Sequence, residues 1–436
     1  MNSSSSEKGY SLEFRAEETK TLIDHILDNH SVEMVGMKRV GINSFINFFL
    51  SHKDNFQKLQ TRGEHLFILV DLDDLIEREI FAFWRLLFKR IVDVVEESNY
   101  ESSIKKNISK LFSKCIQSGD LFLTYDGVRE ALTTLAEEDI YVTIFLPRFD
   151  RLQEKITQEF FDNLQAIRNA ADQKVSYIFT SFRELDTLSQ DNYYEKALAT
   201  AYAIMYIKPA SKADATTELN SFNKRYNVTI PKDLESKILE ITAGHLQYLQ
   251  LSLVVYRELS KKNSELTTTQ IIDAIQNDER IMLQSEELWE SLTPEEQTII
   301  KKIFQQKQIT KEEKKVGEYL WETGMVYDEN SQVKLFSDLF KYFVASHIQD
   351  EEDTNGIEFS KKEYTLFNLL KKSQDAVCER EKIIEVVWPE YKEYGVSDWS
   401  IDRLIARVRG KLKKQKSPYE IVTVRTRGYK LVAANA

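Results

Sequence analysis

The chain has 436 residues, of which 42% are hydrophobic and 30% are charged, and its formal net charge is -11. These values are typical of a globular protein with two to four domains, and they exclude a chain that is basic along its whole length. The charge is unevenly distributed: residues 356–436 contain 17 Lys and Arg against 11 Asp and Glu, a balance of +6, which leaves -17 for residues 1–355. This segregation favours one module that faces nucleic acid, carried on a body that does not bind nucleic acid non-specifically.

The two cysteines, Cys115 and Cys378, are far apart and belong to no CxxC or Cys/His ligand spacing. We therefore predict neither a disulfide framework nor a metal site. Residues 1–10 are polar and rich in Ser, and we expect them to be disordered. The sequence has no apolar signal core and no run of about 18 apolar residues, so we expect a cytoplasmic protein without a membrane partner.

Short apolar segments alternate with helical patterns from residue 11 to residue 210. We predict strands at residues 32–35, within 65–75, and at 141–146, 175–180 and 203–207. A long, mostly helical stretch is predicted over residues 83–115. Alternating strands and helices predict a parallel sheet with helices on both faces.

The first strand is followed by Gly36-x4-Gly41 and a helix rich in Phe, which is the spacing of a phosphate-binding loop. The Lys that would reach the β- and γ-phosphates is replaced by Ile42, and the magnesium-binding hydroxyl is replaced by Asn43. Ser44 would offer a hydroxyl only if the loop slipped by one residue. A nucleotide hydrolase would carry an acidic pair directly after the third strand, but here the first acid, Asp150, comes several residues later. The candidate nucleotide-contacting residues are Gly36, Arg39, Gly41, Ile42, Asn43, Ser44 and Asp150.

Several motifs in this region carry a family resemblance. Phe14-Arg15-Ala16-Glu17 resembles the entry motif of STAND-type P-loop ATPases, which are relatives of the AAA+ class and of the archaeal-ATPase family. In chain order, GMKRVGINSF, PRFDRL, TSFREL, YIKPAS and ITAGHLQYLQL resemble their phosphate loop, acidic-strand motif, sensor strand, domain exit and lid helix. The resemblance covers roughly residues 11–284 and implies an ATPase-like domain at 11–210 with a helical lid at 211–284. His245 is expected to be a packed residue at a helix junction.

The sequence departs from this family at the positions that carry the chemistry. Ile42 and Asn43 stand in the phosphate loop, Pro147 and Arg148 replace the acidic pair, and Leu246 stands where the lid motif usually has Pro. Loss of the Lys, the hydroxyl and the acid removes charge that stabilises phosphoryl transfer. We therefore predict a pseudo-ATPase with no catalytic residues. Binding of ATP or ADP stays open at this point.

Residues 285–346 read as a helical unit followed by a hairpin and a last helix. Thr293 and Pro294, followed by two acids, have the pattern of a helix start. The unit resembles the winged helix that follows STAND lids, which implies a structural or interaction module. The acidic stretch 347–356 is the predicted linker.

A basic helix and a hairpin dominate residues 357–436. One apolar stripe contains Ile401, Ile405, Val408 and Leu412, and the basic side chains lie off it. SKKEYTLFNLL, EREKIIEVVWPEY, DWSIDRLIARVRGKLKK and IVTVRTRGYKLV resemble, in order, the three helices and the wing of the OmpR/PhoB-type winged helix. This resemblance implies a domain that binds duplex DNA.

Family roles are carried over position by position. The resemblance places Ser400, Arg403, Leu404, Arg407 and Lys411 on the groove-facing side of the recognition helix, and Arg425 and Arg427 in the wing. Lys413 and Lys414 either contact phosphates or form a solvated helix end. Arg409 either pairs with a neighbouring acid or touches DNA. Gly410 weakens the helix by roughly 1 kcal/mol relative to Ala and either permits close approach of DNA or is simply tolerated.

The predicted fold class is multidomain α/β: a P-loop-like parallel-sheet domain with a helical lid, then two winged helices of α+β type. The leading hypothesis is a transcription regulator or DNA-targeting factor that reads duplex DNA. Its pseudo-ATPase body would serve oligomerisation or the sensing of a protein partner.

Two alternatives stay open. One is an active ATP-dependent switch. The other is a phospho-acceptor receiver domain starting near residue 65, with an acidic pocket at 71–74 followed by Asp150, Thr180 and Lys208-Pro209. About 75 residues separate its acidic pocket from Asp150, more than one β-α-β-α-β step needs.

Overall fold

The computed structural model describes two compact units, Met1–Ala345 and Ser346–Ala436, and each is presented here by itself. The described residues are 13–188, 202–262, 266–330, 332–353, 359, 361–388, 398–414, 417–424 and 427–433, so the predicted disorder of residues 1–10 lies outside them. Within these ranges, no helix is long and apolar enough to cross a membrane.

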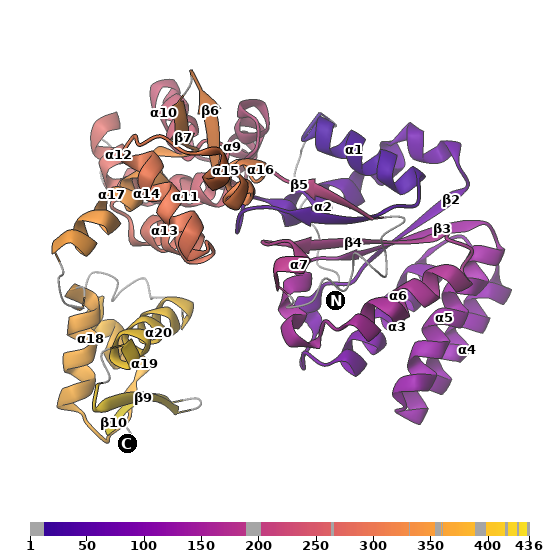
Figure 1. Cartoon of the computed structure of the whole chain (residues 1–436). Helices are drawn as coiled ribbons and strands as arrows, with labels where there is room; N and C mark the ends of the chain where they lie inside the picture. Colours follow the sequence, from indigo (N-terminus) through magenta and orange to yellow (C-terminus); the bar gives the residue numbers. More distant parts are fainter. Residues whose placement is uncertain are drawn as a thin grey trace. The chain divides into compact units, whose positions relative to one another are not determined.

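A five-stranded parallel sheet forms the centre of the first unit (Figure 1). Its strands lie in the order β2-β3-β4-β1-β5, and their bounds are β1 Ser31–Val35, β2 Glu64–Leu69, β3 Ile140–Leu146, β4 Val175–Ser181 and β5 Tyr202–Tyr206. All five predicted strands are therefore confirmed. The receiver-domain alternative is wrong, because a domain starting near residue 65 would omit β1, which pairs with both β4 and β5.

Helices cover both faces of this sheet (Figure 1). One face carries α1 Ala16–Leu27 and α2 Ile42–His52; the other carries α3 Ile80–Glu97, α5 Leu121–Glu137 and α6 Gln158–Ala170. α4 Ser102–Ser118 packs on α3 and α5. The predicted helical stretch 83–115 is thus two helices that are separated at residues 98–101. A short helix, α7 Leu185–Leu188, follows β4.

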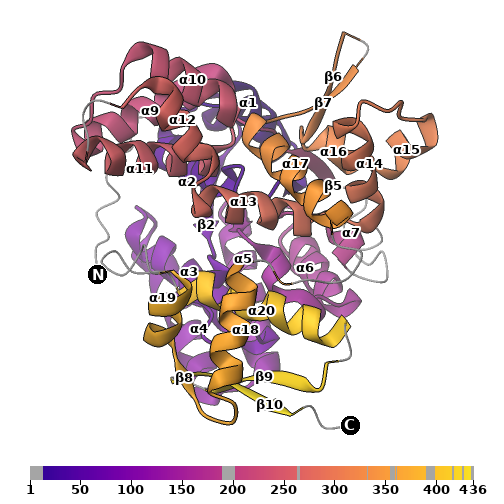
Figure 2. The same ribbon diagram turned by 90° about the vertical axis from the view of Figure 1, so that its left-hand side faces the viewer.

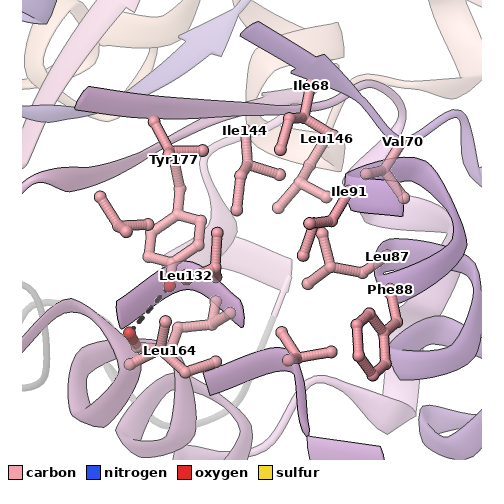
Figure 3. Packing of buried hydrophobic residues seen from close by; sticks show 14 of the residues in the cluster. Ile68, Val70, Leu87, Phe88, Ile91, Leu132, Ile144, Leu146, Leu164 and Tyr177 are labelled. Carbon is pink, nitrogen blue, oxygen red and sulfur yellow. Dashed lines mark hydrogen bonds between the residues drawn. The ribbon is translucent and has the colours of Figure 1, made fainter. Parts of the chain in front are cut away.

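The core follows from the alternation of side chains along the strands. Ile68 and Ile144 point toward α3 and α5, where Leu87 and Leu132 lie (Figure 3). At the same face the buried Tyr177 hydroxyl donates a hydrogen bond of 2.9 Å to the Leu164 carbonyl of α6. On the opposite face, Phe67 and Phe145 pack against Phe49 of α2.

A helical lid and the first winged helix complete this unit (Figure 2). The lid comprises α9 Lys212–Tyr226, α10 Lys232–Thr242, α11 Leu246–Lys262 and α12 Thr268–Gln276. The winged helix has a hairpin, β6 Val326–Glu329 and β7 Gln332–Leu335, and the helices α13 Glu279–Glu290, α14 Pro294–Phe304, α15 Lys311–Val316, α16 Glu318–Glu322 and α17 Asp338–Asp353.

The predicted start of α14 is confirmed in detail. Thr293 and Glu296 form a capping box, and Pro294 occupies the first turn, where a backbone N–H has no partner to lose. The predicted linker 347–356 continues α17 as helix up to Asp353, and residues 354–356 lie outside the described part of the chain.

The second unit has the elements of a winged helix. These are α18 Lys361–Lys372, β8 Cys378–Glu379, α19 Arg380–Val387, α20 Asp398–Lys414, β9 Tyr419–Val424 and β10 Gly428–Ala433, with the strands in the order β8-β10-β9. Gly428 has a φ of 145°, and an added Cβ would lie 2.1 Å from the Cys378 carbonyl oxygen. Close pairing of β10 with β8 therefore requires glycine at this position.

Candidate nucleic-acid interface and phosphate loop

The loop after β1 lines a cavity of about 410 Å³ in the first unit. The cavity brings together all the candidate nucleotide-contacting residues of the sequence, namely Gly36, Arg39, Gly41, Ile42, Asn43, Ser44 and Asp150. It also contains Lys38, Arg148 and Arg151, which sequence reasoning did not single out as contacts. Leu246 and Glu287 line it from the lid and from α13.

The loop conformation depends on glycine and on a lid residue. Gly41 has a φ of 115°, and a Cβ there would lie 2.5 Å from Leu246 Cδ1. The Leu that replaces the usual lid Pro therefore packs directly on the loop. Ile42 Cδ1 lies 3.2 Å from the position of a Cβ on Gly36, so the side chain at the lysine position turns back over the start of the loop.

His245 joins the lid to the phosphate loop. Its Nδ1 accepts a hydrogen bond of 3.3 Å from the Tyr248 backbone N–H, so Nε2 carries the proton and donates to the Lys38 carbonyl at 3.1 Å. Burial lowers the pKa of His245 to about 4, which keeps the ring neutral. The predicted junction residue therefore also anchors the loop. A second link is the ion pair of 2.9 Å between Arg39 Nε and Glu287.

Two arginines, Arg148 and Arg151, follow β3, where the related ATPases carry an acidic pair. Arg148 Nη1 binds the Asp73 carboxylate at 2.6 Å, and Arg151 forms an ion pair with the same carboxylate. Burial raises the pKa of Asp150, although Lys38 and Arg148 oppose that shift. Among the residues that the structure describes, no group of three or more His, Cys, Asp or Glu could hold a metal ion.

The end of β4 connects this cavity to the first winged helix. Phe182 lines the cavity, and the next side chain, Arg183, reaches the α13–α14 junction. Arg183 Nη1 donates to Glu296 at 2.8 Å and Nη2 donates to the Ser291 carbonyl at 2.6 Å. Its guanidinium lies 3.7 Å from the centre of the Tyr319 ring. Burial lowers the pKa of Arg183 more than any single neighbour raises it, but the hydrogen bond with Glu296 and the charges around the guanidinium together outweigh burial, so the net direction is upward.

Helix α20 of the second unit buries one face and exposes the other. The predicted stripe is confirmed, because Ile401, Ile405, Val408 and Leu412 all belong to the core of this unit. Leu404 belongs to the same core with only 1% of its surface exposed, so its predicted place on the groove-facing side is wrong. The physical reason is geometric: Leu404 lies three residues after Ile401 and four before Val408, which places it within the apolar stripe.

Basic residues flank the exposed face of α20. Arg403 and Arg407 are half-buried one turn apart, and Lys413 is exposed. Ala406 and Gly410 are exposed between them, and a Cβ added to Gly410 would meet no atom within 4 Å. The middle of this face therefore presents small side chains with basic groups at its side.

Two of the basic side chains have intramolecular roles. Lys411 donates to the buried Glu363 of α18 at 2.6 Å. Arg409 donates to the Ile421 carbonyl at 2.7 Å and to the Thr423 hydroxyl at 2.8 Å, both on β9, so neither predicted role of Arg409 describes these contacts. These two residues tie α20 to its neighbours.

Of the other predicted DNA contacts, the structure describes the side chain of Arg427 only. Arg427 is exposed at the turn between β9 and β10. Arg425 lies outside the described residues, as do the side chains of Ser400 and Lys414. Trp388 is 1% exposed and belongs to the core.

The comparisons with known proteins identify this second unit. Residues 353–431 match the family described as "Transcriptional regulatory protein, C terminal". The chain carries an OmpR/PhoB-type winged-helix domain at its C-terminus. The transcriptional regulatory protein YxdJ of Bacillus subtilis is 32% identical over 117 residues, which cover 27% of this chain and 47% of YxdJ. The match thus spans about half the length of that curated relative.

Solved structures resemble most of the chain. The ORC2 protein of Aeropyrum pernix, in its ADPNP–ADP complexes, has a TM-score of 0.50 at 12% identity and covers 79% of this chain and 96% of its own. A Walker-type ATPase of Pyrococcus abyssi has a TM-score of 0.48 at 16% identity, with 76% of this chain and 95% of that chain covered. At 12% identity the likeness to ORC2 shows the fold alone.

Proposed function

We propose that this protein is a transcription regulator that binds duplex DNA through α20 and the wing between β9 and β10. The main support for this proposal is that α20 is amphipathic. Its apolar stripe is buried, and Arg403 and Arg407 flank its exposed face. A helix of this kind fits the major groove, where Arg can pair with guanine and phosphate contacts supply most of the salt-dependent affinity.

The body is proposed to be a pseudo-ATPase that assembles the protein or senses a partner. Three features support this proposal: Ile42 lies where a lysine would bind phosphate, Asn43 replaces the magnesium-binding hydroxyl, and Arg148 stands where an acid would face the metal. The loop therefore lacks, at their usual positions, the lysine, the hydroxyl and the acid that hold a magnesium nucleotide and stabilise phosphoryl transfer.

A second candidate function is an ATP-dependent switch. The cavity favours it, because Lys38, Arg39 and Arg151 supply cationic groups beside the loop. A phosphate-release assay on the full chain separates the two. If the body is a pseudo-ATPase, the full chain should release no more phosphate than buffer does. Robust ATP turnover that is abolished by Asp150→Asn would instead support the ATP-dependent switch.

DNA binding is tested by selecting bound duplexes from a random pool with the full-length chain. We expect a defined sequence to be enriched, and Arg403→Ala or Arg407→Ala to weaken binding to it by about 1–3 kcal/mol. Failure to enrich any sequence, together with equal binding by both variants, would contradict the proposal.

A further inference from the structure

The tip of the α4–α5 hairpin carries an unusual concentration of exposed apolar side chains. Ile116, Leu121, Phe122 and Leu123 are 37%, 45%, 70% and 37% exposed. α4 ends at Ser118 and is followed by Gly119 in the left-handed conformation, and Asp120 caps α5 by accepting a hydrogen bond of 2.8 Å from the Leu123 N–H. Phe122 therefore lies in the first turn of α5. We call Ile116, Leu121, Phe122 and Leu123 the apolar tip.

The first winged helix contains a groove of about 740 Å³ between α14, the β6–β7 hairpin and α17. Its apolar lining includes the half-buried Phe304, Ile309, Val333 and Leu335. Tyr327, which is 42% exposed, lies at the same surface. Four lysines also line the groove, namely Lys307, Lys314, Lys334 and Lys341, against two acids, Asp328 and Asp338. We call this surface the basic groove.

The charges of the basic groove are only partly satisfied. Lys314 pairs with Asp328 at 2.7 Å, and Lys334 pairs with Glu329. Lys307 and Lys341 are exposed, and neither forms an ion pair with any residue that the structure describes. The groove therefore offers an apolar floor and two available cations beside the single further acid Asp338, so lysines outnumber acids in it although the net charge of the body is negative.

These two surfaces complement each other in shape and charge. The tip is convex and apolar and has the exposed carboxylate of Asp120 next to Phe122, whereas the groove is concave and has the cations of Lys307 and Lys341. Duplex DNA fits the groove less well, because the neighbouring α16 begins with Glu318 and ends with Glu322, which repel phosphate. Contiguous exposed apolar surface in a folded protein commonly marks an interaction site.

We propose that the apolar tip of one copy inserts into the basic groove of a second copy of this chain. The contact is head-to-tail, so it leaves a free groove on one copy and a free tip on the other, and it propagates into a ring or a short filament. Such an assembly carries several α20 helices and raises avidity for repeated DNA sites without any new base contact. The inference rests on the proposed assembly role of the body and names the surfaces that perform it.

The first test is sedimentation velocity of the full chain and matched variants. We expect Phe122→Asp to weaken self-association by about tenfold or more, because it places a charge in an apolar contact. The charge-reversed K307E/K341E double variant should have a similar effect. Ile76→Asp is the control, since Ile76 is fully exposed outside both surfaces, and it should leave self-association unchanged.

The second test is a disulfide trap between separately purified variants. Phe122→Cys mixed with Tyr327→Cys should give a cross-linked dimer, since both endogenous cysteines are buried. A cross-link formed by Phe122→Cys alone, or one formed within the F122C/Y327C double variant without dimers, would overturn the head-to-tail arrangement. Circular dichroism and DNA binding of each variant verify that it has folded.

The two levels of the proposal fail in different ways. Self-association that persists in both Phe122→Asp and K307E/K341E would overturn these surfaces and leave the assembly role intact. A wild-type chain that stays monomeric at all concentrations would remove both this inference and the assembly role, while DNA binding by α20 would be judged separately by the selection experiment.

Discussion

Arg183 offers the sharpest test of how the sheet is joined to the first winged helix. Its side chain is 10% exposed and that of its partner Glu296 is 4% exposed. Removal of one charge therefore leaves the other buried and unpaired in a site of low dielectric constant. We predict that Arg183→Leu lowers the free energy of unfolding of this unit by about 3–5 kcal/mol. Loss of the bonds to the Ser291 carbonyl and of the Tyr319 ring contact acts in the same direction.

The assay is urea unfolding followed by tryptophan fluorescence, with Arg129→Leu as the matched control. Arg129 pairs with Asp126 on the surface of α5, where both side chains are more than a third exposed, so we expect a loss of only about 0.5 kcal/mol or less. The R183L/E296L double variant should recover part of the stability, because no buried charge is then unpaired. Equal effects of Arg183→Leu and Arg129→Leu would refute the reasoning.

Two further predictions concern buried side chains. Burial in the centre of the sheet raises the pKa of Glu33 to about 7 from 4.5, so its contribution to stability is fully present below about pH 4.5 and is lost as the pH rises through 7. The difference is on the order of 3 kcal/mol, and Glu33→Gln should flatten the stability–pH curve in that window; an unchanged slope would count against this assignment. Leu404→Ala should destabilise the second unit by about 2–5 kcal/mol, whereas Lys413→Ala, at an exposed site, should change its stability by no more than about 0.5 kcal/mol. A thermal melt of each variant decides whether Leu404 belongs to the core.

Much of the fold was predictable because the signals are local. Each strand of the sheet is a short apolar run, and the stripe through Ile401, Ile405, Val408 and Leu412 has the period of a helix. The capping pattern at Thr293 likewise needs only neighbouring residues. Leu404 was misplaced because a family role was carried over to a position whose apolar side chain already fitted the buried stripe.

Contacts between distant segments were not predictable from the sequence. Nothing in the sequence around Arg183 indicates a partner 113 residues away, and Lys411 shows no sign of its bond to the buried Glu363. His245 was placed correctly at a helix junction, but its bond to the Lys38 carbonyl depends on how the lid folds over the loop. Tertiary contacts of this kind follow from packing and not from local pattern.

DNA recognition by α20 is tested most directly by the salt dependence of binding to the selected duplex. The wild-type chain should bind with a steep salt slope, and Arg407→Ala should lose about 1–3 kcal/mol of affinity for that sequence and retain its weaker binding to unrelated DNA. Lys89→Ala, which removes an exposed cation from α3, should bind like wild type. Equal affinity of Arg407→Ala and wild type for the selected sequence would contradict the central claim.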